Sequence, residues 1–434
     1  MSAKDMQPPG IFFGWRIMWA AFVVAVFGWG VGFYGPPVFL HAIVETRGWS
    51  VGLVSTAVTV HFLVGAFAVA NMPAIYRRFG LAATTKVSGL SVALGIAGWA
   101  GAQEPWQLFA ATLLSGFGWA GTGALAINMM ISPWFDRRRP AALSTAYNGA
   151  SVGGVLFSPL WIALIALIGF PATAMIVGAV MAITLWLLSD VFFSLTPEAV
   201  GTRPDGDANM AVRPRALPDY PARPGRQLMA SRAFVTYAAG FAIGLFVQVG
   251  IIAHLISLLV PALGAQGAGF AAGLATLCAI AGRTLVGWCL PAGADRRVVA
   301  AATYAVQAAG CMVFIMAGGQ SVPLLLTGVV LFGLGIGNVT SLPPLIAQSE
   351  FAPADVPRAI ALSTAISQAT FAFAPALFGM IREWGSAGDA AGNPDVPVFF
   401  MVAAAVQLIA AFAYLLGRHS ARIGAVSDTG DPAA

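Results

Sequence analysis

Long apolar stretches alternate with short polar or turn-rich breaks along almost the whole chain. Each stretch is close to the roughly 20 apolar residues that one helix needs to cross a bilayer. The pattern predicts twelve spanning helices, near residues 15–42, 50–72, 82–102, 106–132, 140–166, 171–193, 233–262, 267–290, 298–318, 322–348, 357–381 and 397–417. Helices are expected because each span must satisfy its own backbone hydrogen bonds within lipid.

The break at residues 194–232 differs in kind from the others. It contains six prolines and six arginines but few large apolar residues. A segment of this composition cannot form a packed core and is predicted to be a solvated linker. It divides an all-α membrane protein into an N-terminal six-helix bundle at 1–193 and a C-terminal six-helix bundle at 233–418, followed by a cytoplasmic tail at 419–434.

The amino-acid composition excludes an ordinary water-soluble domain. Of the 434 residues, 59% are hydrophobic and 9% are charged, whereas roughly 25% of residues are charged in soluble domains. The first ten residues are too few and too polar for a separate signal peptide, so the first span is expected to remain in place. We therefore expect a multi-pass integral membrane protein.

Basic residues are distributed unevenly about the predicted membrane. Of the 22 Lys and Arg residues, all except Arg47, Arg382 and Arg283 fall on the side of the N-terminus or at that interface. The positive-inside rule predicts that this side is cytoplasmic, with both termini and the linker, and that Arg47 and Arg382 lie outside. The formal net charge of +5 follows from this topology, so nucleic acid is not an expected partner.

Three short sequences recur in the same order in the two halves. ALSTA occurs at 142–146 and 361–365, and FSPL at 157–160 has its counterpart in FAPAL at 373–377. Upstream, GFGWAGTG in the fourth span corresponds to FGLGIGN in the tenth. The shared order favours an internal duplication. Repeats of this kind imply a substrate site between the halves near the bilayer midplane, with alternating access by rocking of the halves.

A single arginine, Arg283, lies inside the apolar stretch LATLCAIAGRTLVGW at 274–288. Arginine stays protonated in proteins, and its placement in a span costs at least about 2.5 kcal/mol, which makes it a functional-site hypothesis. Its planar fork of donors suits a carboxylate. Ala279, Thr276 and Ala272 precede it at helical spacing and leave room for a ligand, and Thr276 is a candidate substrate-binding residue. The alternative is that its long side chain reaches the cytoplasmic interface.

The segment WFDRRRPAALSTAYNGASVG at 134–153 resembles a motif of the monocarboxylate transporters and their bacterial oxalate/formate-antiporter-like relatives, within the major facilitator superfamily. The family pattern is an aromatic-Phe pair, a basic triplet, and small residues that end in Gly-x-x-x-Gly. It is matched without a gap by Trp134, Phe135, Arg137, Arg138, Arg139, Ala142, Ala146, Gly149 and Gly153. Ser144 and Asn148 depart from it. The resemblance implies the twelve-helix major facilitator fold, no cofactor, and a monomer as the functional unit.

The loop between spans two and three, PAIYRRFGLAA at 73–83, is similar to the general superfamily signature. Arg78 and Gly80 fit it, but Arg77 stands where an aspartate is usual and Leu81 where a basic residue is usual. The corresponding loop after span eight, LPAGADRR at 290–297, keeps Asp295 and Arg296. The resemblance implies that these four matching residues and the triplet Arg137–Arg139 belong to gating motifs.

For the candidate binding residues, the resemblance implies that Arg283 is the span-eight arginine that binds the substrate carboxylate. Relatives that couple transport to protons commonly carry an aspartate four residues earlier, where this chain has Ala279, and no Asp or Glu lies at mid-membrane depth. Spans one, four, seven and ten line the cavity in this superfamily, so Tyr34 and Asn338 are candidate substrate donors. A structural hydrogen bond is the alternative for each.

Two histidines within spans, His61 and His254, are candidates for proton coupling, because histidine changes charge near neutral pH. The alternative for both is a buried neutral histidine that is hydrogen-bonded between helices. The glycines of GFGWAG at 116–121 lie within an apolar span and follow no strand, so close helix packing explains them better than dinucleotide binding. The sequence has no nucleotide-binding Gly-x-x-x-x-Gly-Lys loop, metal-ligand cluster or nucleophile triad.

These patterns together predict a secondary transporter of a small organic anion, with a monocarboxylate favoured because one cation balances one negative charge. Proton symport and anion exchange both remain open. The alternative is a drug or metabolite exporter of the same superfamily, although cation exporters usually need a membrane-embedded acid. An enzyme would need a convergent catalytic set, and a membrane sensor a soluble output domain. The resemblance implies a bacterial inner membrane, with the organic anion, lipid and possible protons as partners.

Overall fold

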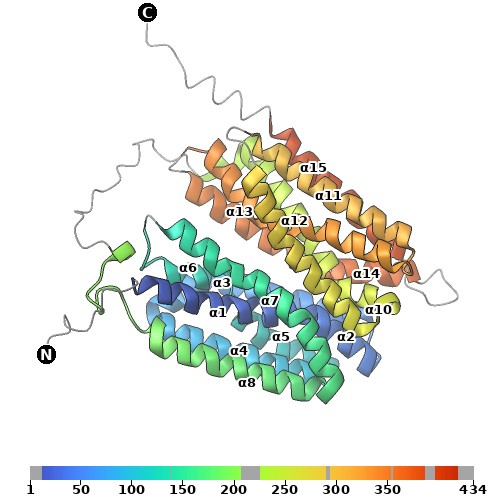
Figure 1. Cartoon of the computed structure of the whole chain (residues 1–434), viewed down its shortest axis with the longest axis horizontal. Helices are drawn as coiled ribbons and strands as arrows, with labels where there is room; N and C mark the ends of the chain where they lie inside the picture. Colours follow the sequence, from blue (N-terminus) through green and yellow to red (C-terminus); the bar gives the residue numbers. More distant parts are fainter. Residues whose placement is uncertain are drawn as a thin grey trace, which may run out of the picture. The chain divides into compact units, whose positions relative to one another are not determined.

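The apolar stretches fold into helices in the computed structural model, which describes residues 12–136, 138–206, 225–289, 294–352, 355–386 and 396–418 (Figure 1). In the first half the helices are α1 (Gly14–Gly32), α2 (Gly35–Arg47), α3 (Val51–Phe79), α4 (Leu81–Gly101), α5 (Pro105–Ala120), α6 (Ala124–Ile131), α7 (Arg139–Ile168) and α8 (Phe170–Leu188). In the second half they are α9 (Gly225–Ala230), α10 (Arg232–Cys289), α11 (Arg296–Ala317), α12 (Val322–Glu350), α13 (Val356–Phe371), α14 (Ala374–Ser386) and α15 (Val396–Leu416).

The described residues group into two compact units. The first contains those within 1–50 and 57–213, and the second those within 51–56 and 214–434. Eleven segments of the described chain are long and apolar enough to cross a membrane. One of them, Arg232–Val286, has 55 residues and is interrupted at Gly264, and each of its parts exceeds the roughly 20 residues of one crossing. The predicted all-α, multi-span fold is therefore confirmed.

Three predicted spans are broken rather than continuous. Span one consists of α1 and α2, which are separated at Phe33 and Tyr34, directly before Gly35, Pro36 and Pro37. Proline lacks a backbone N–H and disfavours the helical conformation of the residue before it, so Pro36 and Pro37 are well placed in the first turn of α2. Span four likewise divides into α5 and α6, and span eleven into α13 and α14. In the sequence, each apolar stretch continues across the break, so its length did not indicate that the helix is interrupted.

Single glycines join consecutive helices in three places. Gly80 connects α3 to α4 with φ 78° and ψ 167°, Gly169 connects α7 to α8 with φ 78° and ψ 161°, and Gly264 interrupts α10 with φ 67° and ψ 168°. This backbone region is essentially restricted to glycine, because a Cβ would clash with the adjacent peptide. One residue is thus sufficient to end one helix and start the next.

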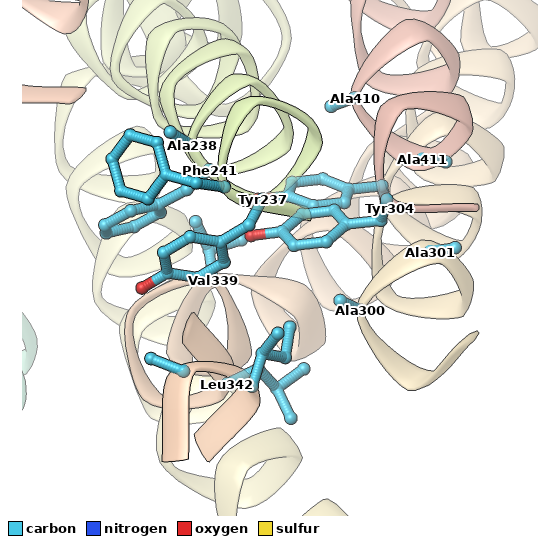
Figure 2. Packing of buried hydrophobic residues seen from close by; sticks show 14 of the residues in the cluster. Tyr237, Ala238, Phe241, Ala300, Ala301, Tyr304, Val339, Leu342, Ala410 and Ala411 are labelled. Carbon is cyan, nitrogen blue, oxygen red and sulfur yellow. The ribbon is translucent and has the colours of Figure 1, made fainter. Parts of the chain in front are cut away.

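Aromatic rings and small residues build the core of the second unit (Figure 2). Tyr304 of α11 and Tyr414 of α15 are buried and stacked, with ring centroids 5.9 Å apart and planes 18° apart. Tyr237 and Phe241 of α10 belong to the same cluster. Its other labelled members include Ala238, Ala300, Ala301, Ala410 and Ala411, small residues that allow the helices to approach closely.

The linker predicted at 194–232 is partly ordered, which its composition did not indicate. Asp205 lies in a single 3-10 turn, Pro204–Gly206, and its side chain is buried. Its carboxylate accepts from the N–H groups of Asp136 and Arg138, both at 3.3 Å, and its own N–H donates to the carbonyl of Trp134 at 2.9 Å. The start of the linker is therefore attached to the loop that precedes α7.

Candidate functional site

Arg283 and Asn338 lie where the second half of α10 crosses α12. Arg283 is half-buried, and its Nε donates to the carbonyl of Gly337 with an N···O distance of 3.3 Å. In the opposite direction, the buried Asn338 amide donates to the carbonyls of Gly282 at 3.4 Å and Leu334 at 3.3 Å. Neighbouring residues of two helices thus exchange side-chain-to-backbone bonds. These bonds turn the Arg283 side chain towards α12.

Close approach of the two backbones makes this crossing possible. A Cβ on Gly282 would overlap the carbonyl oxygen of Leu334, and a Cβ on Gly337 would overlap that of Ala279. Both obstacles are backbone atoms, which cannot rotate away as a side-chain atom can. Small residues allow this kind of close packing between membrane helices. The glycines therefore set the position from which Arg283 extends.

We expect Gly337→Ala to force α12 away from α10 and to lower the free energy of unfolding by about 1–3 kcal/mol, the usual cost of overpacking. The measurement is the apparent midpoint of thermal unfolding of the purified protein in detergent. Gly101→Ala is the matched control, because a Cβ on Gly101 meets no atom within 4 Å. Equal midpoints for the two variants would contradict the close approach.

Thr276 lies about two turns before Arg283 on α10 and is buried. Its hydroxyl donates to the carbonyl of Ala272 on its own helix at 3.1 Å. Ala279, from the same predicted stripe of small residues, lies against Gly337 of α12. At that position the stripe serves helix packing rather than leaving open space. The substrate contact of Thr276 stays a prediction.

Tyr34 lies at the break between α1 and α2 in the first unit and is half-buried, beside a cluster of aromatic rings. Its ring centroid is 5.1 Å from that of Phe33, which lies 6.0 Å from Trp119 and 5.7 Å from Phe62. Trp29 packs edge-on against Trp119 at 5.1 Å. The breaks in spans one and four thus lie beside a largely apolar aromatic surface, and the role of Tyr34 as a substrate donor stays a prediction.

His61 is buried in the first unit within a network that uses both ring nitrogens. Its Nε2 lies 2.9 Å from the carbonyl oxygen of Gly32, and its Nδ1 lies 2.8 Å from Ser115 Oγ. A carbonyl oxygen only accepts, so Nε2 carries the proton and Nδ1 accepts from the Ser115 hydroxyl. Ser115 in turn accepts from Trp99 Nε1 at 3.1 Å. A neutral imidazole satisfies this network completely.

His254 is buried in the second unit and faces a permanent cation. Its Nε2 donates to the carbonyl of Pro375 at 3.0 Å, and its Nδ1 accepts from Arg382 Nη1 at 3.4 Å. The same Nη1 donates to Ser257 Oγ at 2.7 Å. Arg382, which is expected on the outer side of the membrane, has a buried side chain within α14. Protonation of His254 would set two positive charges against each other in an apolar surrounding.

The predicted gating residues of the first unit lie in two loops. Arg78 is exposed at the end of α3, with its guanidinium carbon 5.2 Å from the ring centroid of Phe79, and Gly80 forms the turn into α4. Arg138 is exposed, and its N–H donates to Asp205. Arg137 lies outside the described residues. The gating role of these residues stays a prediction.

Arg139, the third residue of the basic triplet, is bonded to the loop before it. Its Nε donates to the carbonyl of Phe135 at 3.0 Å, and its Nη2 donates to that of Ser132 at 3.1 Å. These bonds run from the first turn of α7 to the end of α6 and the residues that follow it. They fold the basic segment back on the end of span four.

Asp295 begins α11 as its N-cap. The carboxylate accepts from the N–H groups of Arg297 at 3.0 Å and Val298 at 3.4 Å, and from Arg418 Nε at 2.7 Å. Partial desolvation raises the pKa of Asp295, but the hydrogen bonds from Arg418, Val298 and Arg297 outweigh it and hold the pKa below its usual value. Asp295 is therefore ionised at neutral pH and connects the start of α11 to the end of α15.

Arg297, which sequence analysis did not single out, is the most extensively bonded charged residue of this region. Its side chain is fully buried, and its Nε and Nη2 each donate to Glu350 at 2.7 Å in a bidentate pair. Its Nη1 donates to Thr236 Oγ1 at 2.9 Å, and its Nη2 donates to the carbonyl of Ala233 at 2.7 Å. The predicted residue Arg296 donates to a carbonyl of α12. Arg297 thus connects α10, α11 and α12.

The structure brings some of the predicted site residues together at one helix crossing, and the others lie elsewhere. Arg283 and Asn338 meet at one helix crossing, and Thr276 lies two turns away on α10. Tyr34 and His61 belong to the first unit, where the His61 network reaches Gly32 near the break in span one. Within the described ranges, no group of three or more His, Cys, Asp or Glu residues could hold a metal ion.

Comparison with known proteins identifies the family. The family model described as Major Facilitator Superfamily matches residues 18–348, well over half of the chain. Monocarboxylate transporter 11 of Homo sapiens is 25% identical over 308 residues. That alignment covers 66% of this chain but 58% of the human protein. The chain therefore matches less than two thirds of that relative's length.

Solved structures share the fold at low sequence identity. A bacterial homologue of the human lysosomal transporter Spinster, in an inward-facing and occupied conformation, has a TM-score of 0.70 at 14% identity, covering 98% of this chain and all of the other. The nucleoside transporter NupG has a TM-score of 0.67 at 12% identity, with 94% and 99% covered. A D-xylose-proton symporter has a TM-score of 0.68 at 14% identity, with 93% and 97% covered. The chain belongs to the Major Facilitator Superfamily, a family of membrane-embedded secondary transporters and not of enzymes.

Proposed function

We propose that this transporter moves a small organic anion, with a monocarboxylate as the favoured substrate and Arg283 as its counter-charge. The observation that carries the proposal is the position of Arg283, which is half-buried in a membrane-spanning helix and held towards α12 by Gly337. A guanidinium in this position offers a fork of donors that matches a carboxylate bidentately. The name of the human relative, Monocarboxylate transporter 11, is consistent with this substrate class.

The preferred charge of the substrate is inferred from Arg283. At the crossing of α10 and α12, the positive charge of Arg283 is matched by one carboxylate, whereas a dicarboxylate brings a further negative charge into a medium of low dielectric constant. We infer that singly charged acids are preferred over doubly charged ones. We also infer that the protein lies in a bacterial inner membrane. Both termini are inferred to lie in the cytoplasm, because most of the basic residues fall on the side of the N-terminus.

A panel of radiolabelled compounds in proteoliposomes tests the substrate class. It contains monocarboxylates of increasing size, a dicarboxylate, the amide of one accepted acid, and an organic cation. We expect uptake of monocarboxylates alone, because the amide has the same shape without the charge. Uptake of the cation or the amide at the rate of the acid would contradict the proposal and favour a drug or metabolite exporter. Imposed pH gradients and preloaded substrate distinguish symport from exchange.

The two histidines are expected to differ in the pH dependence of uptake. We expect His254→Gln to leave the pH profile unchanged, because protonation of His254 is opposed by Arg382 at 3.4 Å. At His61, the Ser115 hydroxyl could turn towards the carbonyl of Thr112, at 3.4 Å, and leave Nδ1 open to a proton. If a histidine couples protons, His61→Gln is therefore the variant that flattens the profile. A flattened profile for His254→Gln alone would contradict this assignment.

A further inference from the structure

An ion pair on the surface of the first unit connects α4 to the residues that follow α8. Lys86 of α4 is paired with Asp190, which lies in a π-helical turn, Ser189–Phe193, directly after α8. The side chains are 20% and 54% exposed, respectively. The ammonium group of Lys86 also lies 4.8 Å from the ring centroid of Trp186, within the range of a cation–π interaction.

The surroundings of this pair are apolar and exposed. On α4 and the end of α8 the exposed large side chains near the pair are Val87, Leu90, Ile183, Trp186, Leu187 and Val191. In a membrane-spanning protein an exposed apolar face of this kind is covered by lipid. The pair is thus a charged group on a lipid-facing surface.

The depth of the pair corresponds to the lipid headgroup region. Lys86 comes five residues after Leu81, where α4 begins, which is roughly 8 Å along the helix axis at 1.5 Å per residue. Asp190 comes three residues before the end of the span Phe170–Phe193. Trp186 has the position typical of tryptophans at the membrane–water boundary.

The π-helical turn determines which way Asp190 points. The N–H of Ser194 donates to the carbonyl of Ser189 at 3.0 Å, the i to i−5 pattern of this turn. In a regular α-helix, Asp190 and Phe193 would lie three residues apart on nearly the same face. The wider turn separates them, so that Phe193 is buried while Asp190 is exposed beside Lys86.

We propose that Lys86, Asp190 and Trp186 bind the headgroup of a phospholipid that carries both a phosphate and a primary ammonium group. An ammonium group has three donors and a carboxylate about four acceptor positions, so each retains bonding capacity beyond the ion pair. The lipid phosphate accepts from Lys86, and the lipid ammonium donates to Asp190. The acyl chains lie along the apolar face beside Trp186. A trimethylated headgroup has no N–H to donate, and an anionic headgroup without an amine brings no positive charge to Asp190 that would offset its phosphate.

Native mass spectrometry of the purified full chain tests this site with phosphatidylethanolamine, phosphatidylcholine and phosphatidylglycerol of matched acyl chains. We expect phosphatidylethanolamine to bind roughly fivefold more tightly than either of the others. Asp190→Asn should reduce that preference to the level of phosphatidylcholine, and Lys86→Gln should weaken binding of all three lipids. Glu45→Gln is the control, because Glu45 is an exposed carboxylate outside this surface.

Equal binding of the three lipids, a preference for phosphatidylglycerol, or an unchanged preference in Asp190→Asn would each overturn the proposal. Folding is monitored by the thermal midpoint of every variant, and the comparison of the three lipids on the unmodified chain does not depend on any variant. The readout is lipid binding rather than uptake, so it is independent of the substrate proposed above.

Discussion

Replacement of Arg283 by alanine is expected to lower anion uptake about 100-fold or more while the protein still folds. The estimate follows from the loss of one bidentate, charge-assisted interaction, roughly 3 kcal/mol, at about 1.4 kcal/mol per tenfold change. The thermal midpoint of the purified variant is compared with that of the unmodified protein, so that a loss of uptake is distinguished from a loss of folding. Initial rates of uptake into proteoliposomes provide the measurement.

A lysine variant separates the charge of Arg283 from the geometry of its guanidinium group, and a second variant is the control. Arg283→Lys keeps the positive charge but loses the planar fork, and we expect it to recover little of the uptake. Thr284→Val is the matched control, because Thr284 is exposed and its hydroxyl donates to the carbonyl of Ile280 on its own helix. Normal uptake by Arg283→Ala would refute the site, whereas full recovery by Arg283→Lys would show that a point charge is sufficient.

The largest effect on stability is expected at Arg297 and Glu350. Their side chains are 0% and 10% exposed, and removal of one partner of a buried pair leaves an uncompensated charge, at a cost of about 3–5 kcal/mol. Glu350→Ala should therefore lower the apparent midpoint of thermal unfolding markedly, or prevent accumulation of the folded protein. The double variant Arg297→Met with Glu350→Leu should recover much of the loss, because no charge then remains unpaired.

A second ion pair of the same unit is the matched comparison. Arg418 and Asp295 have a similar N···O distance of 2.7 Å, but their side chains are 41% and 39% exposed. Exposed pairs contribute about 0–1 kcal/mol, so Arg418→Ala should have little effect on the midpoint. If Arg418→Ala destabilised the protein as much as Glu350→Ala, burial would not be the cause of the difference.

The all-α fold and nearly every spanning segment could be predicted from the sequence, because apolar length is the dominant requirement of a bilayer. The breaks at Phe33–Tyr34 and at residues 121–123 could not, although Pro36, Pro37 and the nearby glycines mark them in hindsight. Hydropathy is averaged over a window of residues, so it does not detect a break in the helix within that window. Order at Asp205 was missed because one buried carboxylate among many polar residues has no compositional signal.

Among the site residues, the sequence places Arg283 and Asn338 in two helices that pack together in the structure. It does not show that Arg283 donates to the carbonyl of Gly337, or that Asn338 donates to the carbonyl of Gly282. The choice of Arg296 over Arg297 followed the family loop pattern. A signal for Arg297 did exist, since it is in helical phase with the buried residues Tyr304, Ala308 and Cys311 of α11. The contact of His254 with Arg382 joins residues 128 positions apart, and neither residue's local sequence indicates it.

The turn at Gly80 changes how mutational tolerance in its loop should be interpreted. Gly80 is exposed, and a Cβ placed on it would meet no other atom within 4 Å. Its φ of 78° nevertheless excludes every L-amino acid at low energy. A saturation library should therefore find this surface position intolerant, together with Gly169 and Gly264, whatever the compound transported. Sensitivity at these three glycines is therefore expected from the turn conformation alone and would not by itself demonstrate a gating role.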